Sequence, residues 1–554
     1  MVTNTQFKQS LLGASAMLVL AACGGGGGGG GGGESPPPPP GPLTLQGTAA
    51  TGAAIAGAPV AAKCASGTGS TTTRTDGRYT ISIGATTTSL PCVVEVAPAG
   101  GAALRSVAAG SGGGSATVNI TPLTELVVAR VARAAPASFF TSFESAKVTP
   151  GAVNTAIAEV AKGLQGIVDL AGANPITDTL VAANGTTPGN ANDQRLDQLQ
   201  AALVKAQSTF GELTTATVTS SKSMASVNRL VQPAFASCSG LRSGKYRILN
   251  PHEVGPGGLQ EYVAHTFTVN ASASPPTAVD DNDLTGQVKP LTPDAAQACQ
   301  FTHALTRGDM ASVFVTKSGV MAWVSNTTPN RTSLALPEQL LLVEDLAGSF
   351  NYLGHERSTV GAPFAPASGT LTVDASGQVT AESTCAGLAP CVPRNGPLAA
   401  FTANSSGGFN RGAQRYFAFQ SPTGDVSVMG IDSQNASVYV GTKQAALGLP
   451  AVGEESNVFD FSVAGVTFTS TRADESTTVI SVDMTAPSFT REREGDARRD
   501  TFTINQPRNG LRHRPASGSG AAAVQVMPLP GSNSAVYTSI APADSFFGVA
   551  LDKP

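Results

Sequence analysis

The chain has 554 residues, of which 41% are hydrophobic and 13% are charged, and its formal net charge at neutral pH is −4. This hydrophobic content excludes a wholly disordered chain, and the length allows about two to four domains. The sequence pI near 5.8 gives no sign of the basic face that nucleic-acid-binding proteins use, so we expect no nucleic-acid partner.

The first 22 residues have the pattern of an export signal. Lys8 is the only charged residue among the first ten, and residues 11–20 are an apolar run that ends in Ala21-Ala22. A membrane-spanning helix needs about 20 apolar residues, so this run is too short to span a bilayer. Residues 1–22 are therefore predicted to be a secretory signal peptide.

The signal ends in Leu20-Ala21-Ala22-Cys23, which resembles the lipobox of bacterial lipoproteins. The resemblance implies that Cys23 is diacylated on sulfur, released by cleavage and acylated on its new amino group. Acyl chains of this kind anchor a protein to the membrane without a transmembrane helix. Gly24, in place of Asp, implies export to the outer membrane, with the body facing the periplasm or the cell surface. The alternative is an ordinary signal peptide with an unmodified cysteine.

Residues 23–42 are predicted to be a tether. Ten glycines follow Cys23, and a proline run at 36–40 comes after them. Glycine-rich chain is a flexible coil and polyproline a stiffer spacer, so together they would hold a folded body about 30 Å from the lipid.

Seven cysteines are present, and six remain once Cys23 is assigned to the lipid. An even number in an exported chain predicts three disulfide bonds. Fifteen connectivities exist for six cysteines; we favour the sequential one, since each pair then falls within one predicted domain. The predicted pairs are Cys64 with Cys92, Cys238 with Cys299, and Cys385 with Cys391. The alternative is metal binding: Cys299 and His303 have a ligand spacing, but no second pair completes a set of four.

Residues 43–122 are predicted to form a β-sandwich. Asp76-Gly77 precedes an alternating run at Tyr79, Ile81 and Ile83, which is typical of a turn followed by a strand. The order Gly-x-x-Ile-x-Gly-Ala-x-Val over 52–60, then Thr-Asp-Gly-x-Tyr, resembles the carboxypeptidase regulatory-like (transthyretin-like) domain. The resemblance implies a seven-stranded sandwich that is a spacer or binding module, sometimes grouped with carbohydrate-binding folds. It transfers no catalytic residue.

Residues 123–235 are predicted to form a small helical domain. Thr121-Pro122 and Thr149-Pro150 each combine an N-cap threonine with proline at the first helical position. Apolar residues from Val153 to Val168 then recur at steps of three and four. Asn192-Asp193 is predicted to open a third helix.

Residues 236–554 are predicted to form a large antiparallel β-barrel-like domain, either one barrel or a pair of barrel-like subdomains, so the chain is multidomain and mainly β. Hairpins are predicted at Ser318-Gly319, Ser376-Gly377 and Thr423-Gly424, each between two apolar strands. The segment 346–352 resembles the Gly-x-Trp opening of lipocalin-type barrels, with Phe350 in place of tryptophan. The whole plan resembles that of the surface lipoproteins of Gram-negative bacteria.

Three short motifs resemble parts of functional sites, but none of them forms a complete site. Asp281-Asn-Asp283 begins like a calcium loop, but its twelfth position is Thr292 instead of glutamate. Arg307-Gly-Asp309 is an integrin-type tripeptide at an expected turn. The stretch around Ser519 lacks both glycines of a hydrolase nucleophile elbow. We expect a solvated acidic loop, a turn and a linker, respectively.

The remaining polar candidates are isolated. The five histidines have no ligand spacing among themselves, and the sole tryptophan, Trp323, is expected in a core. The charges of the run 491–500 cancel, so it is expected to be an exposed hairpin tip, with a partner contact as the alternative.

We therefore assign no catalytic residue, no metal site and no cofactor. The favoured hypothesis is a membrane-anchored, non-enzymatic binding module for a protein, a carbohydrate or a small apolar ligand. The alternatives are a structural envelope lipoprotein and a hydrolase whose site is assembled from residues distant in sequence.

Overall fold

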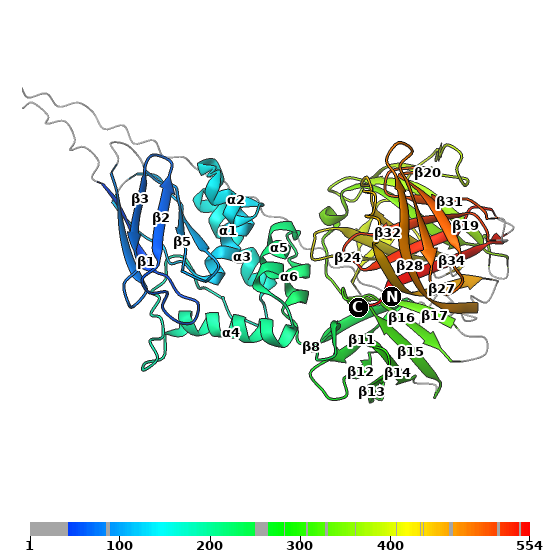
Figure 1. Ribbon diagram of the computed structural model, residues 1–554, viewed down its shortest axis with the longest axis horizontal. Helices are drawn as coiled ribbons and strands as arrows, with labels where there is room; N and C mark the ends of the chain where they lie inside the picture. The colour runs from blue at the N-terminus through cyan, green and yellow to red at the C-terminus, as the bar shows by residue number, and fades with distance from the viewer. Residues whose placement is uncertain are drawn as a thin grey trace, which may run out of the picture.

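The computed structural model describes residues 42–554, except for 85–88, 113, 250–263, 282, 306–307, 327–330, 360–361, 406, 433, 436, 465–468, 518–520 and 542–543. The predicted signal peptide, Cys23 and the tether up to residue 41 lie outside the described residues. Figure 1 shows the described chain as an elongated molecule, with a β-sandwich at one end, helices in the middle and a β-rich body at the other end.

The sandwich consists of a three-stranded and a four-stranded sheet. Its strands are β1 (Leu43–Thr48), β2 (Pro59–Cys64), β3 (Thr68–Thr72), β4 (Arg78–Ile83), β5 (Cys92–Val96), β6 (Leu104–Ala108) and β7 (Ser115–Thr117). The alternation predicted for β4 is confirmed, because Tyr79, Ile81 and Ile83 are buried while the residues between them are exposed. This is the period of two that a strand with one buried face requires.

The helical domain follows directly. Its helices are α1 (Pro122–Ala132), α2 (Pro136–Thr141), α3 (Pro150–Gly163), α4 (Ala191–Ala206), α5 (Phe210–Thr219) and α6 (Ala225–Leu230). Thr121 and Thr149 are N-caps as predicted. The predicted start at Asn192-Asp193 is wrong by one to two residues, since the side chain of Asn190 caps α4 by accepting from the Asp193 N–H.

One hydrophobic core runs through the sandwich and the helices, from Leu43 to Val231. A buried ion-pair network joins the two parts: Arg105 of β6 lies 2.8 Å from Glu125 of α1 and 2.7 Å from Glu95 of β5. Burial raises the pKa of Glu125. The sandwich and the helices are therefore packed as a single unit.

The β-rich body contains, within the described ranges, two closed barrels of eight strands and one open sheet of nine. Barrel 1 closes through the pairing of β10 with β17. Its strands are β10 (Gly244–Leu249), β11 (Ala264–Asn270), β12 (Thr277–Asp280), β13 (Val288–Pro293), β14 (Gln300–Ala304), β15 (Met310–Val315), β16 (Met321–Ser325) and β17 (Arg331–Pro337). A short hairpin of β8 (Ala234–Phe235) and β9 (Cys238–Arg242) precedes it.

Barrel 1 is filled with side chains. Tyr246 stacks on Phe267 with ring centroids 5.3 Å apart, and Phe267 meets Trp323 edge-on at 4.8 Å. Trp323 is 6% exposed, which confirms its expected place in a core.

The open sheet follows barrel 1, with strand order β21-β20-β19-β18-β26-β25-β24-β23-β22. Its strands are β18 (Gly348–Glu356), β19 (Ala365–Val373), β20 (Val379–Thr384), β21 (Val392–Pro393), β22 (Thr402–Ala403), β23 (Phe409–Arg411), β24 (Gln414–Gln420), β25 (Val426–Asp432) and β26 (Ser437–Lys443). Phe350, on which the lipocalin resemblance rests, lies in β18 of this open sheet and not in a closed barrel.

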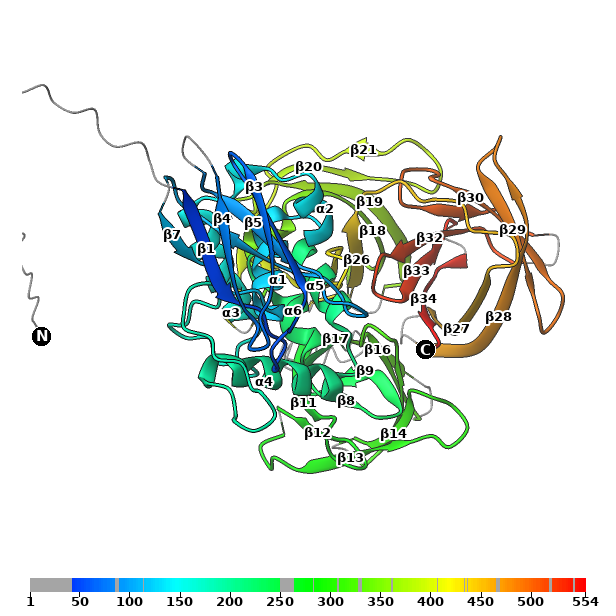
Figure 2. The same cartoon turned by 60° about the vertical axis from the view of Figure 1, so that its left-hand side comes forward.

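Barrel 2 ends the chain and closes through the pairing of β28 with β29. Its strands are β27 (Glu455–Ala464), β28 (Thr469–Asp483), β29 (Ser488–Arg493), β30 (Arg499–Ile504), β31 (Arg512–Arg514), β32 (Val524–Leu529), β33 (Ser534–Ser539) and β34 (Phe546–Asp552). Figure 2 shows barrel 2, in orange to red, beside the yellow-green open sheet. The mainly-β fold class is thus confirmed, and the barrel-like region is divided into three units.

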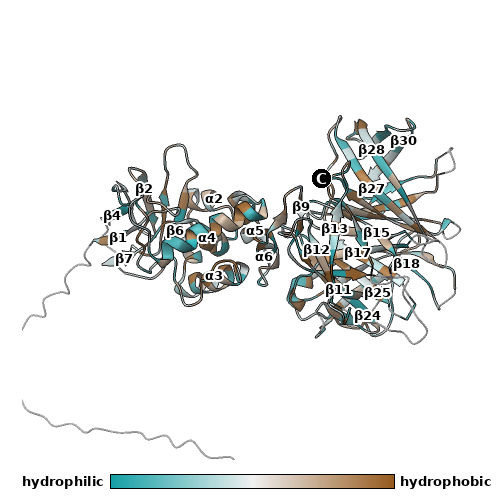
Figure 3. Cartoon of the chain, turned by 90° about the horizontal axis from the view of Figure 1, so that it is seen from below, coloured by the Kyte–Doolittle hydropathy of each residue, from teal (hydrophilic) through white to brown (hydrophobic). Residues whose placement is uncertain are grey.

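These three units share an apolar core made from their outer faces. Phe314 of barrel 1 contacts Phe459 and Phe461 of barrel 2, with ring centroids 4.9 and 5.1 Å apart. Phe417 and Met429 of the open sheet belong to the same core. In Figure 3, β27 and β28 carry both brown and teal segments. For β27, one face meets this core and the other faces the barrel interior.

The three disulfide bonds join the cysteines in the expected sequential order. Cys64 and Cys92 face each other directly across β2 and β5. Each bond lies within one structural unit, and the bonded cysteines are 28, 61 and 6 residues apart in the sequence. Such cross-links stabilise a fold mainly by restricting the unfolded chain.

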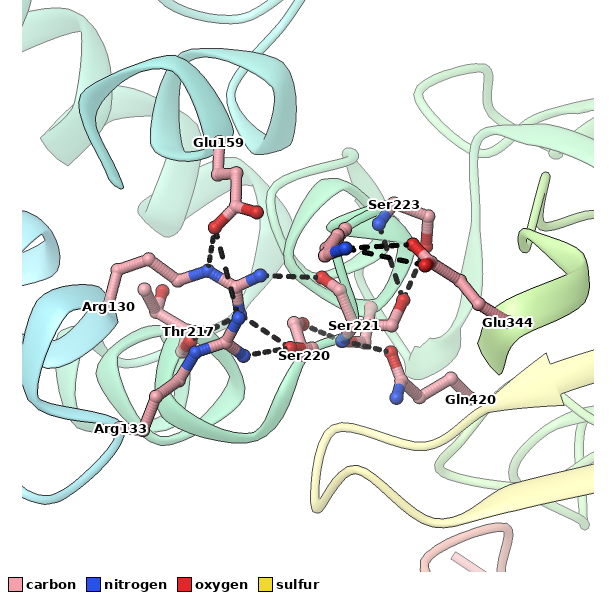
Figure 4. A network of polar contacts seen from close by, with 11 residues as sticks. Arg130, Arg133, Glu159, Thr217, Ser220, Ser221, Ser223, Glu344 and Gln420 are labelled. Atoms are coloured by element: carbon pink, nitrogen blue, oxygen red, sulfur yellow. Dashed lines mark hydrogen bonds and ion pairs between the residues drawn. The ribbon is translucent and has the colours of Figure 1, made fainter. Parts of the chain in front are cut away.

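Arg130 organises the junction between the helices and the β-rich body. Its guanidinium donates to the carbonyl oxygens of Thr217, Ser220 and Ser221 at the end of α5, and pairs with Glu159 of α3. The Thr217 and Ser220 carbonyls are among those that the end of a helix leaves without partners. Figure 4 shows Arg130 and Arg133 on one side of this loop and Gln420 on the other.

The same loop contacts the open sheet. The Ser221 N–H donates to Gln420 Oε1 at 3.1 Å, and Thr219 Oγ1 donates to the Pro422 carbonyl at 3.0 Å. The loop held by Arg130 is thus part of the surface on which the β-rich body sits.

We predict that Arg130→Ala lowers the free energy of unfolding by about 3–5 kcal/mol, because it leaves carbonyls and the Glu159 carboxylate without their buried donor. Arg133→Ala is the matched control, since its side chain is 47% exposed and contacts the same Ser220 and Glu159. It should cost about 1 kcal/mol or less. Urea unfolding followed by circular dichroism measures both variants; equal losses would contradict the role assigned to Arg130.

Candidate functional site

A cavity of about 370 Å³ opens on the face of the open sheet that is turned away from the shared core. This volume is in the range of small-molecule binding sites. Its apolar lining comes from the strands and the segments that flank them: Leu346, Phe350, Leu371, Val373, Phe401 and Val428. Its polar lining consists of Tyr352, Glu356, Glu382, Thr384, Arg394, Arg411, Gln414, Tyr416 and Tyr439. The site is therefore amphipathic.

Three tyrosines shape this cavity, and each stands directly opposite a glycine on the neighbouring strand. These cross-strand pairs are Tyr352 with Gly369, Tyr416 with Gly430 and Tyr439 with Gly354. A Cβ atom at Gly430 would lie 2.3 Å from the Tyr416 ring, and one at Gly369 would lie 2.3 Å from the Tyr352 hydroxyl oxygen. The glycines thus leave the room into which the phenol rings lie.

Two carboxylates of the cavity are already bound by neighbouring side chains. Glu382 accepts from Arg411 at 2.6 Å and from Arg394 at 3.4 Å. Glu356 accepts from the Tyr439 hydroxyl at 2.9 Å. Charge-assisted bonds of this kind hold the polar groups in fixed directions.

The phenols stay protonated at neutral pH. Burial raises the pKa of Tyr416 to about 12, and burial with the Glu356 carboxylate raises that of Tyr439 further. Burial also raises the pKa of Tyr352. The Tyr439 and Tyr416 hydroxyls donate their protons to Glu356 and Gln414, and each phenol oxygen remains able to accept a hydrogen bond.

The residues singled out by sequence do not meet in this cavity. Asp281 is held by Thr266 and Thr268 at 2.6 and 3.0 Å, and Asp283 accepts from Thr285 in its own turn. Asn282, between them, lies outside the described residues. Among described side chains, no group of three or more His, Cys, Asp or Glu residues is placed to hold a metal ion.

The other motifs are also dispersed. Arg307 of the Arg-Gly-Asp tripeptide, His252 and Ser519 lie outside the described residues. The remaining histidines occupy separate places: His265 near Asp280, His303 against Trp323, His355 bonded to Ser545, and His513 in β31.

The charged segment 491–500 is only partly the exposed hairpin tip that the sequence predicts. Residues 494–497 are exposed, as a hairpin tip should be, but Arg491, Arg493 and Asp500 line the interior of barrel 2. The charges that cancel along the sequence alternate between the two faces of β29, because a strand points successive side chains in opposite directions.

Sequence reasoning missed the tyrosine cavity. A signal exists in Tyr352-Leu-Gly354 and Tyr439-Val-Gly441, where β18 and β26 repeat the same Tyr-x-Gly pattern. Two strands that pair across this pattern bring each ring over a glycine. The pattern indicates a packed aromatic surface, whereas the cavity also depends on residues from β19, β20 and β24.

No family model and no curated protein matches the sequence. Two solved structures are similar to parts of the chain. One is a protein of unknown function from the DUF3598 family of Nostoc punctiforme, with 13% identity over 38% of this chain and 97% of that chain, and a TM-score of 0.14. The other is isotype 1 transferrin binding protein B from serogroup B Neisseria meningitidis, with 8% identity over 56% of this chain and 77% of that chain, and a TM-score of 0.18. At these TM-scores neither likeness carries an argument about this chain.

We predict that Gly430→Ala destabilises the open sheet by about 1–3 kcal/mol, because the new methyl group displaces the Tyr416 ring. Gly448→Ala is the control, since no atom would lie within 4 Å of its Cβ. It should change stability by less than about 1 kcal/mol. Urea unfolding gives the free energies, and near-ultraviolet circular dichroism reports the tyrosine environment. An unaltered spectrum for Gly430→Ala would disprove the contact.

Proposed function

We propose that this chain is a lipid-anchored envelope protein that binds a small amphipathic organic molecule in the tyrosine-lined cavity and does not transform it. The observation that carries the proposal is the division of the cavity lining. Leu346, Phe350 and Val428 offer an apolar surface, while polar groups such as those of Tyr352 and Thr384 offer hydrogen bonds. Polar groups placed beside apolar surface are the usual means of orienting a small ligand.

The engagement of the carboxylates supports binding over catalysis. A general acid or base needs a carboxyl oxygen that is free to exchange a proton with the substrate. Glu382 is neutralised by two guanidinium groups, and Glu356 accepts the Tyr439 proton donor. Both carboxylates therefore act to fix the surrounding donors in place.

The anchoring part of the proposal rests on sequence. Cys23 follows a signal-like apolar run and precedes a long glycine and proline tether. Among the helices described, none is sufficiently long and apolar to cross a membrane. Three acyl chains would give stable attachment, since each buried CH₂ contributes about 0.8 kcal/mol. The proposal includes an outer-membrane location, which rests on Gly24 as the residue after Cys23.

Binding is tested with N-phenyl-1-naphthylamine, a neutral apolar fluorophore that gains intensity in apolar sites. We expect a saturable increase with the wild-type protein. Leu371→Trp, which fills part of the cavity, should weaken binding by about tenfold or more, since it displaces the ligand from apolar contacts worth ~1–3 kcal/mol. Leu388→Trp is the matched control, because Leu388 is 49% exposed and outside the cavity.

Equal affinity in Leu371→Trp and wild type, or no saturable signal at all, would refute the proposed cavity function. Circular dichroism of both tryptophan variants shows whether the fold is retained.

Anchoring is tested separately by Cys23→Ser. We expect the wild-type protein to incorporate radiolabelled palmitate and to leave membranes only with detergent, because acyl chains hold it by the hydrophobic effect. The Cys23→Ser variant should incorporate no label. Gly24→Ala, which keeps the thiol, is the control and should behave like wild type. Release of the wild-type protein by salt alone would disprove the lipid anchor.

A further inference from the structure

The interior of barrel 2 differs from that of barrel 1. It holds a cavity of about 780 Å³, to which all eight strands contribute. Its charged lining residues are five arginines, one lysine and six carboxylates: Arg491, Arg493, Arg498, Arg512, Arg514, Lys553, Glu454, Glu455, Asp460, Glu475, Asp500 and Asp552. Charged groups inside a barrel need partners, because taking a charge out of water is costly.

Three of the arginines have such partners. Arg493 lies 2.8 Å from the Glu475 carboxylate. Arg498 and Arg514 lie 2.9 and 3.4 Å from Asp500, whose side chain is 4% exposed. These ion pairs engage the carboxylates of Glu475 and Asp500, both of which are buried.

Arg491 and Arg512 are bound differently. The Arg491 guanidinium lies over the Phe502 ring at 4.8 Å, and the Arg512 guanidinium lies over Phe489 at 5.3 Å. The two rings are stacked on each other, 5.3 Å apart with an interplanar angle of 15°. Within the described ranges, both arginines form no ion pair, and the Nε atom of each is buried without a hydrogen-bond partner.

This arrangement leaves the buried Nε–H donor of each arginine without an acceptor. Carboxylates act on both charges from beyond ion-pair distance: Glu475, Asp500 and Asp460 on Arg491, and Glu454 and Asp552 on Arg512. A guanidinium over an aromatic ring uses its face for the ring, while its N–H groups point outward in its own plane. Burial lowers the pKa of both arginines, and the Arg491 charge lowers that of Arg512 as well, against the opposing effect of the nearby carboxylates. An anion in the cavity would relieve both penalties and satisfy the free donors.

One carboxylate of the opposite wall, Asp460, loses its charge at mildly acidic pH. Asp460 accepts from the Tyr537 hydroxyl at 2.6 Å. Burial, assisted by the Glu475 charge, raises the pKa of Asp460 to about 7 against the opposing effect of Arg491 and Arg493. Below that pH the Asp460 side chain is neutral, so it does not compensate the arginines.

We propose that barrel 2 is a binding site for a small organic anion, whose carboxylate or phosphate group is held by Arg491 and Arg512 beside the stacked Phe489–Phe502 pair. The cavity is large enough for a molecule of several heavy atoms, and the phenylalanine rings offer it an apolar wall. This site is independent of the tyrosine cavity, because the two lie in different structural units.

The test is calorimetric titration of the purified protein with succinate and, separately, with sulfate, in a cationic buffer free of other oxyanions. Succinate stands for carboxylate ligands, and sulfate for tetrahedral phosphate-like ones. We expect saturable binding of at least one anion, and the stronger one identifies the class of the natural ligand. Failure of both to bind would overturn the proposal.

Arg491→Gln and Arg512→Gln should each weaken binding by about tenfold or more, because each removes a charged hydrogen-bond donor. Arg499→Gln is the matched control: Arg499 is on β30 but is 68% exposed and pairs with Glu492 outside the cavity. Its affinity should equal that of wild type. Unchanged affinity in both cavity variants would place the anion elsewhere and overturn the proposal.

A second readout does not depend on the folding of the arginine variants. The charge of sulfate is constant between about pH 6 and pH 8, whereas Asp460 ionises in this range. Wild-type affinity should therefore fall by about tenfold over this rise in pH. Asp460→Asn should abolish the fall, since its amide cannot ionise. The same fall in wild type and Asp460→Asn would contradict the site.

Discussion

The apolar core between the outer faces of the two barrels and the open sheet is the interaction on which the C-terminal half depends. A barrel normally buries its apolar side chains inside itself. Here Phe459 and Phe461 of β27 point outward against Phe314 of barrel 1. Because burial outside the barrel supplies stability, the interior of barrel 2 is released from that task and can hold arginines, carboxylates and a cavity. Barrel 1, with its interior of Tyr246, Phe267 and Trp323, uses both faces and has no such freedom.

The open sheet also has one face in the shared core and one face at a cavity. Its outer face, with Phe417, Met429 and Val440, belongs to the shared core. Its other face is only partly filled, since glycines such as Gly354 and Gly430 withhold the side chains that would complete it. In barrel 2 the cavity lies between inward side chains that are charged and that ion pairs, such as Arg493 with Glu475, hold along the wall. In the open sheet it arises because inward side chains are missing.

The sequence predicts the local structure of this protein well. Period-two alternation gives β4, the threonine-proline pairs give the starts of α1 and α3, and dipeptides such as Ser318-Gly319 give the hairpins. The sequential disulfides could be anticipated because each closes within a compact unit. These features depend only on neighbours in the chain.

The arrangement of the strands could not be predicted in the same way. Met321 to Val324 are apolar at every position, so the pattern does not reveal which face of β16 is the barrel interior. The closure of barrel 2 depends on β27 pairing with β34 at the end of the chain as well as with its neighbour β28, which is a long-range event. Arg491, Glu492 and Arg493 sum to a weak charge along the chain, yet only their separation onto two faces of β29 creates a site.

Apolar contact is non-directional, so the shared core alone does not fix the angles at which the three units meet. Polar bonds at its edge supply that information. Asn351 of β18 donates to the Asn509 carbonyl at 2.6 Å, and Ser368 of β19 donates to Gln525 of β32 at 3.0 Å. Buried polar groups tolerate few alternative partners, because a group left unpaired is costly. Each bond therefore selects one packing of the open sheet on barrel 2, and the two cavities keep fixed positions on opposite sides of a common core.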